Sequence, residues 1–125
     1  MRASPQLSQA RESHLSEQSL ALLRRLLVAE ADTQAARFAA HEALISQLRD
    51  LTDADSVLER ELAEAGAVRA QETMADVGHA LERIHLGTYG SCEACGVPMP
   101  FERLEAIPWA RLCVACPPRV RSPLR

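Results

Sequence analysis

Four cysteines, arranged as two C-x2-C pairs, are the residues of this chain whose types and spacing most clearly indicate chemistry. The pairs are Cys92 with Cys95 and Cys113 with Cys116; seventeen residues separate them, and the chain contains no other cysteine. A tight bend within each pair directs two thiolates to the same side, and a linker of this length can bring the second pair round to complete a tetrahedron. The spacing predicts one structural Zn²⁺ ion bound by four sulfurs.

Two disulfides are the alternative use of these cysteines, and they would need an oxidising compartment. The N-terminus, beginning Met1-Arg-Ala-Ser-Pro, is polar and lacks the apolar run of a signal peptide, so we expect a cytoplasmic protein. A thioredoxin-like redox role would need one C-x-x-C in a βαβ context, which this sequence lacks. A site closed by four sulfurs leaves no position for a reacting water, which argues for a structural metal ion and against a catalytic one.

Composition and charge narrow the class of protein further. Aromatic residues make up only 3% of the chain, and three of the four lie around the cysteines, so the first 85 residues must pack with aliphatic residues and alanine. Residues 1–85 carry nine Arg and fourteen acidic residues, net −5, whereas residues 86–125 carry five Arg and three acidic residues, net +2. An acidic long segment argues against wrapping on nucleic acid. No apolar run approaches the roughly 18 residues of a membrane span.

The first 85 residues read as two long helices joined by an acidic turn. No Gly or Pro occurs over about residues 7–49, and apolar or small residues recur there at coiled-coil spacing, at Leu15, Leu22, Leu26, Ala29, Ala36, Ala40, Leu44 and Leu48. Asp and Thr then break the pattern over residues 50–56, and a second helix is expected over about residues 56–85. The short connection predicts an antiparallel hairpin. One unbroken helix in an intermolecular coiled coil is the alternative.

Local signals place the ends and the contact face of the second helix. Ser56 with Glu59 matches a capping box at its start, and Gly87 supplies a terminating residue at its end. Gly66 and Gly78 lie inside this helix, and each lowers its stability by about 1 kcal/mol relative to Ala. Close approach of the facing helix would compensate for this loss. Two apolar stripes are expected to contact the first helix: Leu58, Leu62 and Ala65, and then Met74, Val77, Leu81 and Ile84. The expected fold is mainly α, a two-helix hairpin over residues 1–85, a four-cysteine zinc module over residues 86–116 and a short tail over residues 117–125.

The cysteine region closely resembles the zinc-finger signature of the DksA/TraR family. The resemblance runs through LERIHLGTYGSCEACG, residues 81–96, and RLEAIPWARLCVAC, residues 103–116. It matches at Cys92, Cys95, Arg103, Pro108, Cys113 and Cys116, and Met99 stands where an aliphatic Ile is usual. We expect Arg103 to brace the module through backbone carbonyls or a neighbouring acid, and Trp109 to pack against the zinc loops.

The resemblance implies a bacterial transcription regulator that binds RNA polymerase and not promoter DNA. It implies that the coiled coil enters the secondary channel of the polymerase and that acidic residues at its tip act near the catalytic centre. The corresponding residues here are Asp50, Asp53 and Asp55, of which Asp55 replaces a small residue of the family pattern. The plainer interpretation of these three carboxylates is that they are turn and cap residues.

Other features of longer family members do not carry over directly. The chain ends nine residues after Cys116, so their C-terminal helix is not expected, and Asp76 stands where a ppGpp pocket would need a basic residue, although Arg69 could fill another such position. Dependence on ppGpp is therefore left open. A different class of function also stays open: a zinc-finger adaptor or nucleic-acid-binding module whose coiled coil dimerises.

Overall fold

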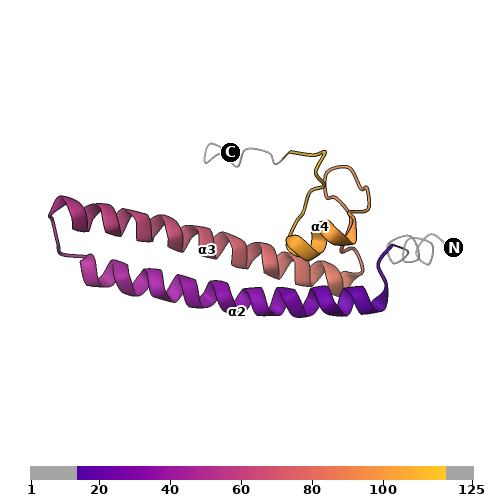
Figure 1. The fold of residues 1–125 in the computed structure, drawn as a ribbon, viewed down its shortest axis with the longest axis horizontal. Coiled ribbons are helices and arrows are strands. Elements are labelled where there is room, and N and C mark those ends of the chain that lie inside the picture. The colour runs from indigo at the N-terminus through magenta and orange to yellow at the C-terminus, as the bar shows by residue number, and fades with distance from the viewer. Residues whose placement is uncertain (1–13, 118–125) are drawn as a thin grey trace.

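The computed structural model describes residues 14–117 and contains two long helices and one short helix. Helix α2 spans Glu17–Leu48, α3 spans Ala54–Leu86 and α4 spans Phe101–Ala106. α2 and α3 lie antiparallel along the length of the molecule, and α4 packs with its loops at the end where α2 begins and α3 ends (Figure 1). The mainly α fold expected from the sequence, a helical hairpin followed by a small cysteine module, is confirmed.

α2 begins where a serine caps it. The Ser16 hydroxyl oxygen accepts a hydrogen bond from the backbone N–H of Ser19 at 2.9 Å, so it pairs one of the N–H groups that the first turn leaves free. The sequence placed the start near residue 7, but the described helix starts at Glu17 because of this cap. The rest of the expected early segment, residues 7–13, lies outside the described residues, as does the tail beyond Pro117.

α3 is capped at both ends, and one of the two caps differs from the prediction. The Asp53 carboxylate accepts the backbone N–H of Ser56 at 2.9 Å, so Asp53 is the N-cap and Ser56 lies in the first turn. The capping box predicted from Ser56 is therefore wrong, because the side chain of Asp53, and not that of Ser56, pairs a free backbone N–H group of the first turn. At the other end Gly87 adopts a left-handed φ of 81°, which confirms the predicted terminator.

The contact between α2 and α3 has the predicted coiled-coil spacing but a different phase over most of its length. α2 buries Leu23, Leu27, Gln34 and Leu48, and α3 buries Ala63, Gly66, Ala67, Ala70, Val77 and Ala80. Of the predicted α3 stripes, the second is confirmed at Val77, which is buried, and at Leu81 and Ile84, which pack against the core. In the first stripe Leu58 and Leu62 are 56% and 63% exposed. Small residues on α3 let the two backbones approach, which a row of leucines would prevent. The far part of the hairpin is consequently slender.

Gly66 shows how close the helices come. A Cβ atom at this position would lie 2.5 Å from the Cε1 and Nε2 atoms of His41, because the imidazole of α2 rests on the bare backbone of α3. The predicted compensation for a helical glycine is confirmed here. At Gly78 nothing lies within 4 Å of such a Cβ, so close approach does not explain that glycine.

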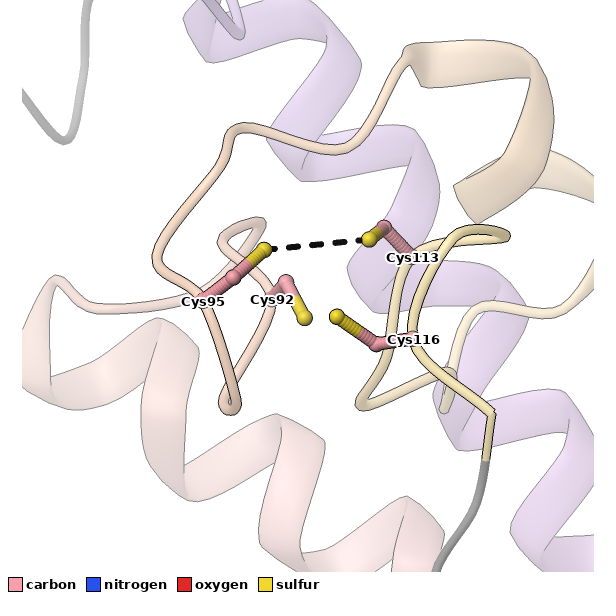
Figure 2. Close-up of side chains that lie close together, drawn as sticks. All are labelled: Cys92, Cys95, Cys113 and Cys116. Carbon is pink, nitrogen blue, oxygen red and sulfur yellow. Dashed lines mark hydrogen bonds between the residues drawn. The ribbon is translucent and has the colours of Figure 1, made fainter.

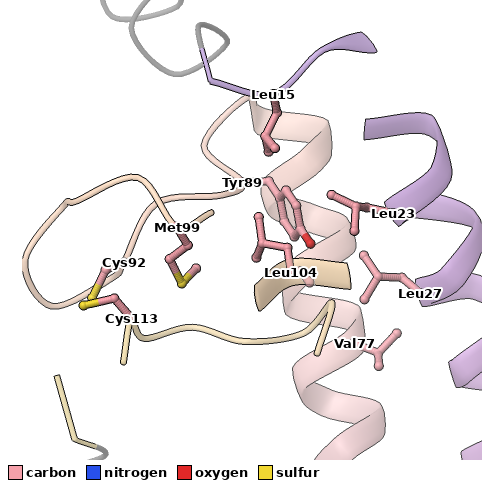
Figure 3. Close-up of a cluster of buried hydrophobic side chains, with 10 residues drawn as sticks. Leu15, Leu23, Leu27, Val77, Tyr89, Cys92, Met99, Leu104 and Cys113 are labelled. Carbon is pink, nitrogen blue, oxygen red and sulfur yellow. The ribbon is translucent and has the colours of Figure 1, made fainter. Parts of the chain in front are cut away.

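The hydrophobic core lies where the hairpin meets the cysteine module (Figure 3). The start of α2 contributes Leu23 and Leu27, both 0% exposed, and the module contributes Met99 and Leu104, also 0% exposed. Buried Tyr89 donates its hydroxyl hydrogen to the carbonyl of Pro108 at 2.8 Å, so the one polar atom of its ring is paired. Because one hydrophobic cluster includes residues from both parts, the module packs directly on the base of the hairpin. No helix in the described part of the chain has the length and hydropathy needed to cross a membrane.

Candidate metal centre and hairpin tip

The loop between α3 and α4 forms the first cysteine turn. The backbone N–H of Gly96 donates to the carbonyl of Cys92 at 2.8 Å, and Gly96 takes a φ of 80°, a conformation that glycine adopts without strain. The second turn follows α4, where the N–H of Cys116 donates to the carbonyl of Cys113 at 3.1 Å. Figure 2 shows the four sulfurs converging from these two turns.

The four sulfurs have the spacing of a tetrahedral zinc site. All four Sγ atoms lie within 4.8 Å of one another, and those of Cys95 and Cys113 are 3.8 Å apart. A tetrahedron with Zn–S bonds of about 2.3 Å has sulfur–sulfur edges of about 3.8 Å. A disulfide would need about 2.05 Å, and the cysteines are free thiols. The four-cysteine centre for one structural metal ion therefore fits Zn²⁺, and disulfides are not formed.

The electrostatics of the cluster also favour a cation. Backbone N–H groups, foremost that of Cys113, lower the pKa of Cys92 to about 6. Close approach of the other sulfurs, foremost that of Cys113, raises the pKa of Cys116 to about 12. The Cys92 thiol therefore ionises readily, whereas a second negative charge on the Cys116 sulfur beside it is unfavourable. A divalent cation at the centre offsets this repulsion and allows all four thiolates to form.

The second cysteine turn is held by Arg103, as the sequence predicted. Its Nε donates to the carbonyl of Leu112 at 2.9 Å, one residue before Cys113. The two turns are also joined directly, because the N–H of Glu93 donates to the carbonyl of Arg111 at 2.8 Å. Trp109, expected to pack against the zinc loops, is partly buried and packs against the core cluster, which includes Cys92 and Cys113.

A network of charges fixes the metal module to α3. Glu93, inside the first cysteine turn, accepts from Arg83 at 3.2 Å and contacts His79, both on α3. Arg111, near the second turn, donates to the Asp76 carboxylate at 2.9 Å. Each cysteine turn therefore has its own ionic contact with α3. Asp76, the acid that stands where a ppGpp pocket would need a base, is engaged in holding the module.

The three acidic residues proposed for the tip lie together at the opposite end of the hairpin. Asp50 lies in the turn that follows α2, Asp53 caps α3 and Asp55 lies in the first turn of α3; all three are exposed. Hydrogen bonds from the backbone and side chain of Ser56 lower the pKa of the Asp53 carboxyl, so it is ionised at neutral pH. The plainer interpretation, a cap, is correct for Asp53, and nothing in its geometry prevents a second role.

Sequence reasoning missed the residue that closes the tip, Arg60. Its guanidinium donates to the carbonyls of Leu48 at 2.8 Å and Leu51 at 3.2 Å. The carbonyls at the C-terminal end of a helix have no partner within the helix and carry its partial negative charge, so a cation there is favourable. An arginine shortly after a predicted turn was the only available signal, and many exposed helical arginines share it.

Comparisons with known proteins agree with this arrangement. Residues 87–118 match the model of the prokaryotic DksA/TraR C4-type zinc finger. An uncharacterized protein of Aquifex aeolicus (strain VF5) is 52% identical over 44 residues, which cover 35% of this chain and 30% of that protein. General stress protein 16O of Bacillus subtilis (strain 168) is 48% identical over 44 residues, covering 35% and 27%. Protein YteA of the same organism is 46% identical over 57 residues, covering 46% and 24%. The matched part of the chain thus spans less than a third of each of these curated relatives.

Among solved structures, the structure of transcription factor DksA2 from Pseudomonas aeruginosa matches with a TM-score of 0.73 and 24% sequence identity. The match covers 90% of this chain and 92% of that one, so it includes the hairpin as well as the cysteine module. At this identity the likeness establishes the fold. Residues 87–118, which contain the four-sulfur geometry, match the family model of the DksA/TraR C4-type zinc finger, and the whole chain shares the fold of the DksA2 structure.

Proposed function

We propose that this protein binds bacterial RNA polymerase in the cytoplasm and inserts its hairpin into the secondary channel to modulate initiation, without enzymatic activity of its own. The observation that supports this most is the position of the acidic turn. Asp50, Asp53 and Asp55 lie at the free end of the hairpin, and the zinc module lies at the other end (Figure 1). The proposal extends to this chain what the family resemblance implies.

The dimensions of the hairpin suit a probe that enters a deep pore. α2 has 32 residues and α3 has 33. At about 1.5 Å per residue each helix is roughly 48 Å long. The contact face of α3 is largely alanine and glycine in the half nearer the tip, at Ala63, Gly66, Ala67 and Ala70, so the pair stays thin there.

The two ends of the hairpin differ in the contacts that stabilise them, and this difference supports different roles for the base and the tip. The core, the metal ligands and the ionic contacts of Asp76 and Glu93 are concentrated at the base of the hairpin. The tip is held by local hydrogen bonds from Arg60 and Ser56, which leave the carboxylates exposed to a partner. In the channel these carboxylates would act electrostatically near a magnesium-bearing centre. The proposal contains no ppGpp-binding step, because Asp76 is already paired with Arg111.

The experiment compares Asp53→Asn with the wild type in two assays that use purified bacterial RNA polymerase. Asparagine keeps the size of the side chain and its ability to cap α3, so folding and polymerase affinity should be retained. Removal of the charge should abolish the effect on open-complex lifetime in an in vitro initiation assay. Glu64→Gln removes the same charge from an exposed position farther along α3 and is the matched control.

Two results would contradict the proposal. If the protein does not bind polymerase but shows salt-sensitive binding to free DNA or RNA, it is a nucleic-acid-binding zinc-finger module. If Asp53→Asn regulates as well as the wild type while it remains bound, the acidic turn is only a cap, and the mechanism assigned to it is wrong.

A further inference from the structure

The half of α3 nearest the tip carries its leucines on the outside of the hairpin. Leu58 and Leu62 are 56% and 63% exposed, and Ala65 is exposed as well. Their spacing of four and three residues places them in one row along the helix surface. The face that contacts α2 in this half consists of Ala63, Gly66, Ala67 and Ala70. Folding alone would favour the opposite arrangement, because burial of a leucine removes more apolar surface from water than burial of an alanine.

Acidic residues border this leucine row. Asp55 lies three residues before Leu58, and Glu61 lies three residues after it. Glu59 lies three residues before Leu62. Residues three apart are neighbours on the surface of a helix, so each of these carboxylates lies beside a leucine. All three acidic side chains are exposed, and none is in an ion pair with another residue of the described part of the chain. An apolar row with a polar border is typical of a surface that a protein partner covers.

The charge around the leucine row limits what can cover it. Residues 50–65 carry six acidic residues and one Arg, net −5. That arginine, Arg60, donates its hydrogen bonds to the carbonyls of Leu48 and Leu51. The negative charge repels nucleic acid and anionic lipid, and a second copy of the chain would bring two acidic faces together. A protein partner that carries Lys or Arg beside its own apolar side chains complements both the row and its border.

We propose that the row of Leu58, Leu62 and Ala65 docks a basic amphipathic helix of the polymerase, an inference that rests on the function proposed above. The side chains of a second helix pack beside a row with this spacing, whereas an extended segment would turn unpaired backbone N–H and C=O groups toward apolar side chains. The row begins five residues after Asp53, about 7.5 Å along the helix. A contact there fixes the depth and rotation of the hairpin and so positions the carboxylates of the tip.

The test measures the affinity of the zinc-loaded full chain for purified bacterial RNA polymerase. The double variant Leu58→Gln with Leu62→Gln should bind at least about tenfold more weakly than the wild type, because two apolar contacts are lost. The matched control is Leu58→Met with Leu62→Met, which should bind like the wild type. Glutamine and methionine have similar length and helix propensity, so the two variants differ in apolar character alone. Both leucines are exposed, so the thermal melts of the two variants should match that of the wild type.

A second double variant, Glu59→Gln with Glu61→Gln, tests the basic character of the partner. It should bind polymerase more weakly at low salt, and its affinity should fall less steeply with added salt than that of the wild type. An unchanged salt dependence would contradict a basic partner.

The outcomes separate this inference from the function on which it rests. If the wild type does not bind polymerase, the proposed function itself is wrong. If the wild type binds and the glutamine variant of the two leucines binds equally well, only the docking of the leucine row is overturned. Equal weakening by the glutamine and methionine variants would also overturn it, because the contact would then not depend on apolar character.

Discussion

Replacing Leu27 by alanine tests the observed phase of the hairpin contact. Leu27 is 0% exposed and lies in the core that joins α2 to α3 and to the zinc module. Leu27→Ala removes buried methyl groups and leaves a cavity, which costs about 2–5 kcal/mol in well-packed cores. Domains of this size are stable by about 5–15 kcal/mol, so the loss is a large fraction of the total. At about 4–8 °C per kcal/mol, the melting temperature should fall by about 8 °C or more.

The control for this prediction is Leu62→Ala, at a position that the sequence pattern had placed in the helix contact. Leu62 is 63% exposed, so its replacement should change the free energy of unfolding by no more than about 0.5 kcal/mol. The measurement is thermal unfolding of both zinc-loaded variants, followed by circular dichroism at the helical band. Equal losses, or a larger loss at Leu62, would show that the helices pack in the phase expected from the sequence and not in the observed one.

Three further predictions follow from the site and the packing. Cys92→Ser, or treatment of the wild type with a strong zinc chelator, should disorder residues 86–116 in amide NMR spectra while much of the helical signal stays; an equally ordered metal-free module would contradict the zinc assignment. Tyr89→Phe should destabilise the protein at neutral pH by about 1–3 kcal/mol because a buried carbonyl loses its donor. Burial raises the pKa of Tyr89 from 10.0 to about 12. Its contribution to the free energy of unfolding is therefore complete below about pH 10 and is lost as the pH rises through 12. The melting temperature of Tyr89→Phe should consequently fall less steeply with increasing pH than that of the wild type. Gly66→Ala should lower the melting temperature although alanine favours helix, because its Cβ meets the His41 ring; a stabilised variant would show that the ring moves away freely.

The metal centre could be predicted almost completely from the sequence, for a physical reason. Two C-x2-C turns at this separation have few other uses, because the chemistry requires four sulfurs at fixed distances. The spacing of Cys92, Cys95, Cys113 and Cys116 in the sequence was therefore enough to predict that their four sulfurs come together in the fold. The role of Arg103 followed in the same way, since a long cationic side chain beside an irregular loop is well placed to pair the carbonyls of that loop.

The hairpin was predictable in outline and not in detail. The absence of Gly and Pro and the acidic break indicate two helices, but a helix that is rich in alanine has several faces of similar hydropathy. Which of these faces is buried depends on how closely the two helices approach. On α3 the face of small residues allows close approach and is buried, whereas the face that carries Leu58 and Leu62 is exposed. Long-range contacts such as those of Arg60 and of Arg111 with Asp76 have no periodic signal at all.

The most direct test of the central claim is a crosslink from the tip of the hairpin to the polymerase. A photo-crosslinking amino acid replaces Leu51, which is 45% exposed in the acidic turn and uses only its backbone carbonyl to pair with Arg60. After irradiation with purified RNA polymerase, mass spectrometry should locate the crosslink on residues that line the secondary channel near the catalytic centre. The same amino acid in place of exposed Val114, beside the metal centre, should crosslink at or outside the channel mouth. Crosslinks from Leu51 to the outer surface of the polymerase, or to promoter DNA, would contradict the claim that the hairpin works inside the channel.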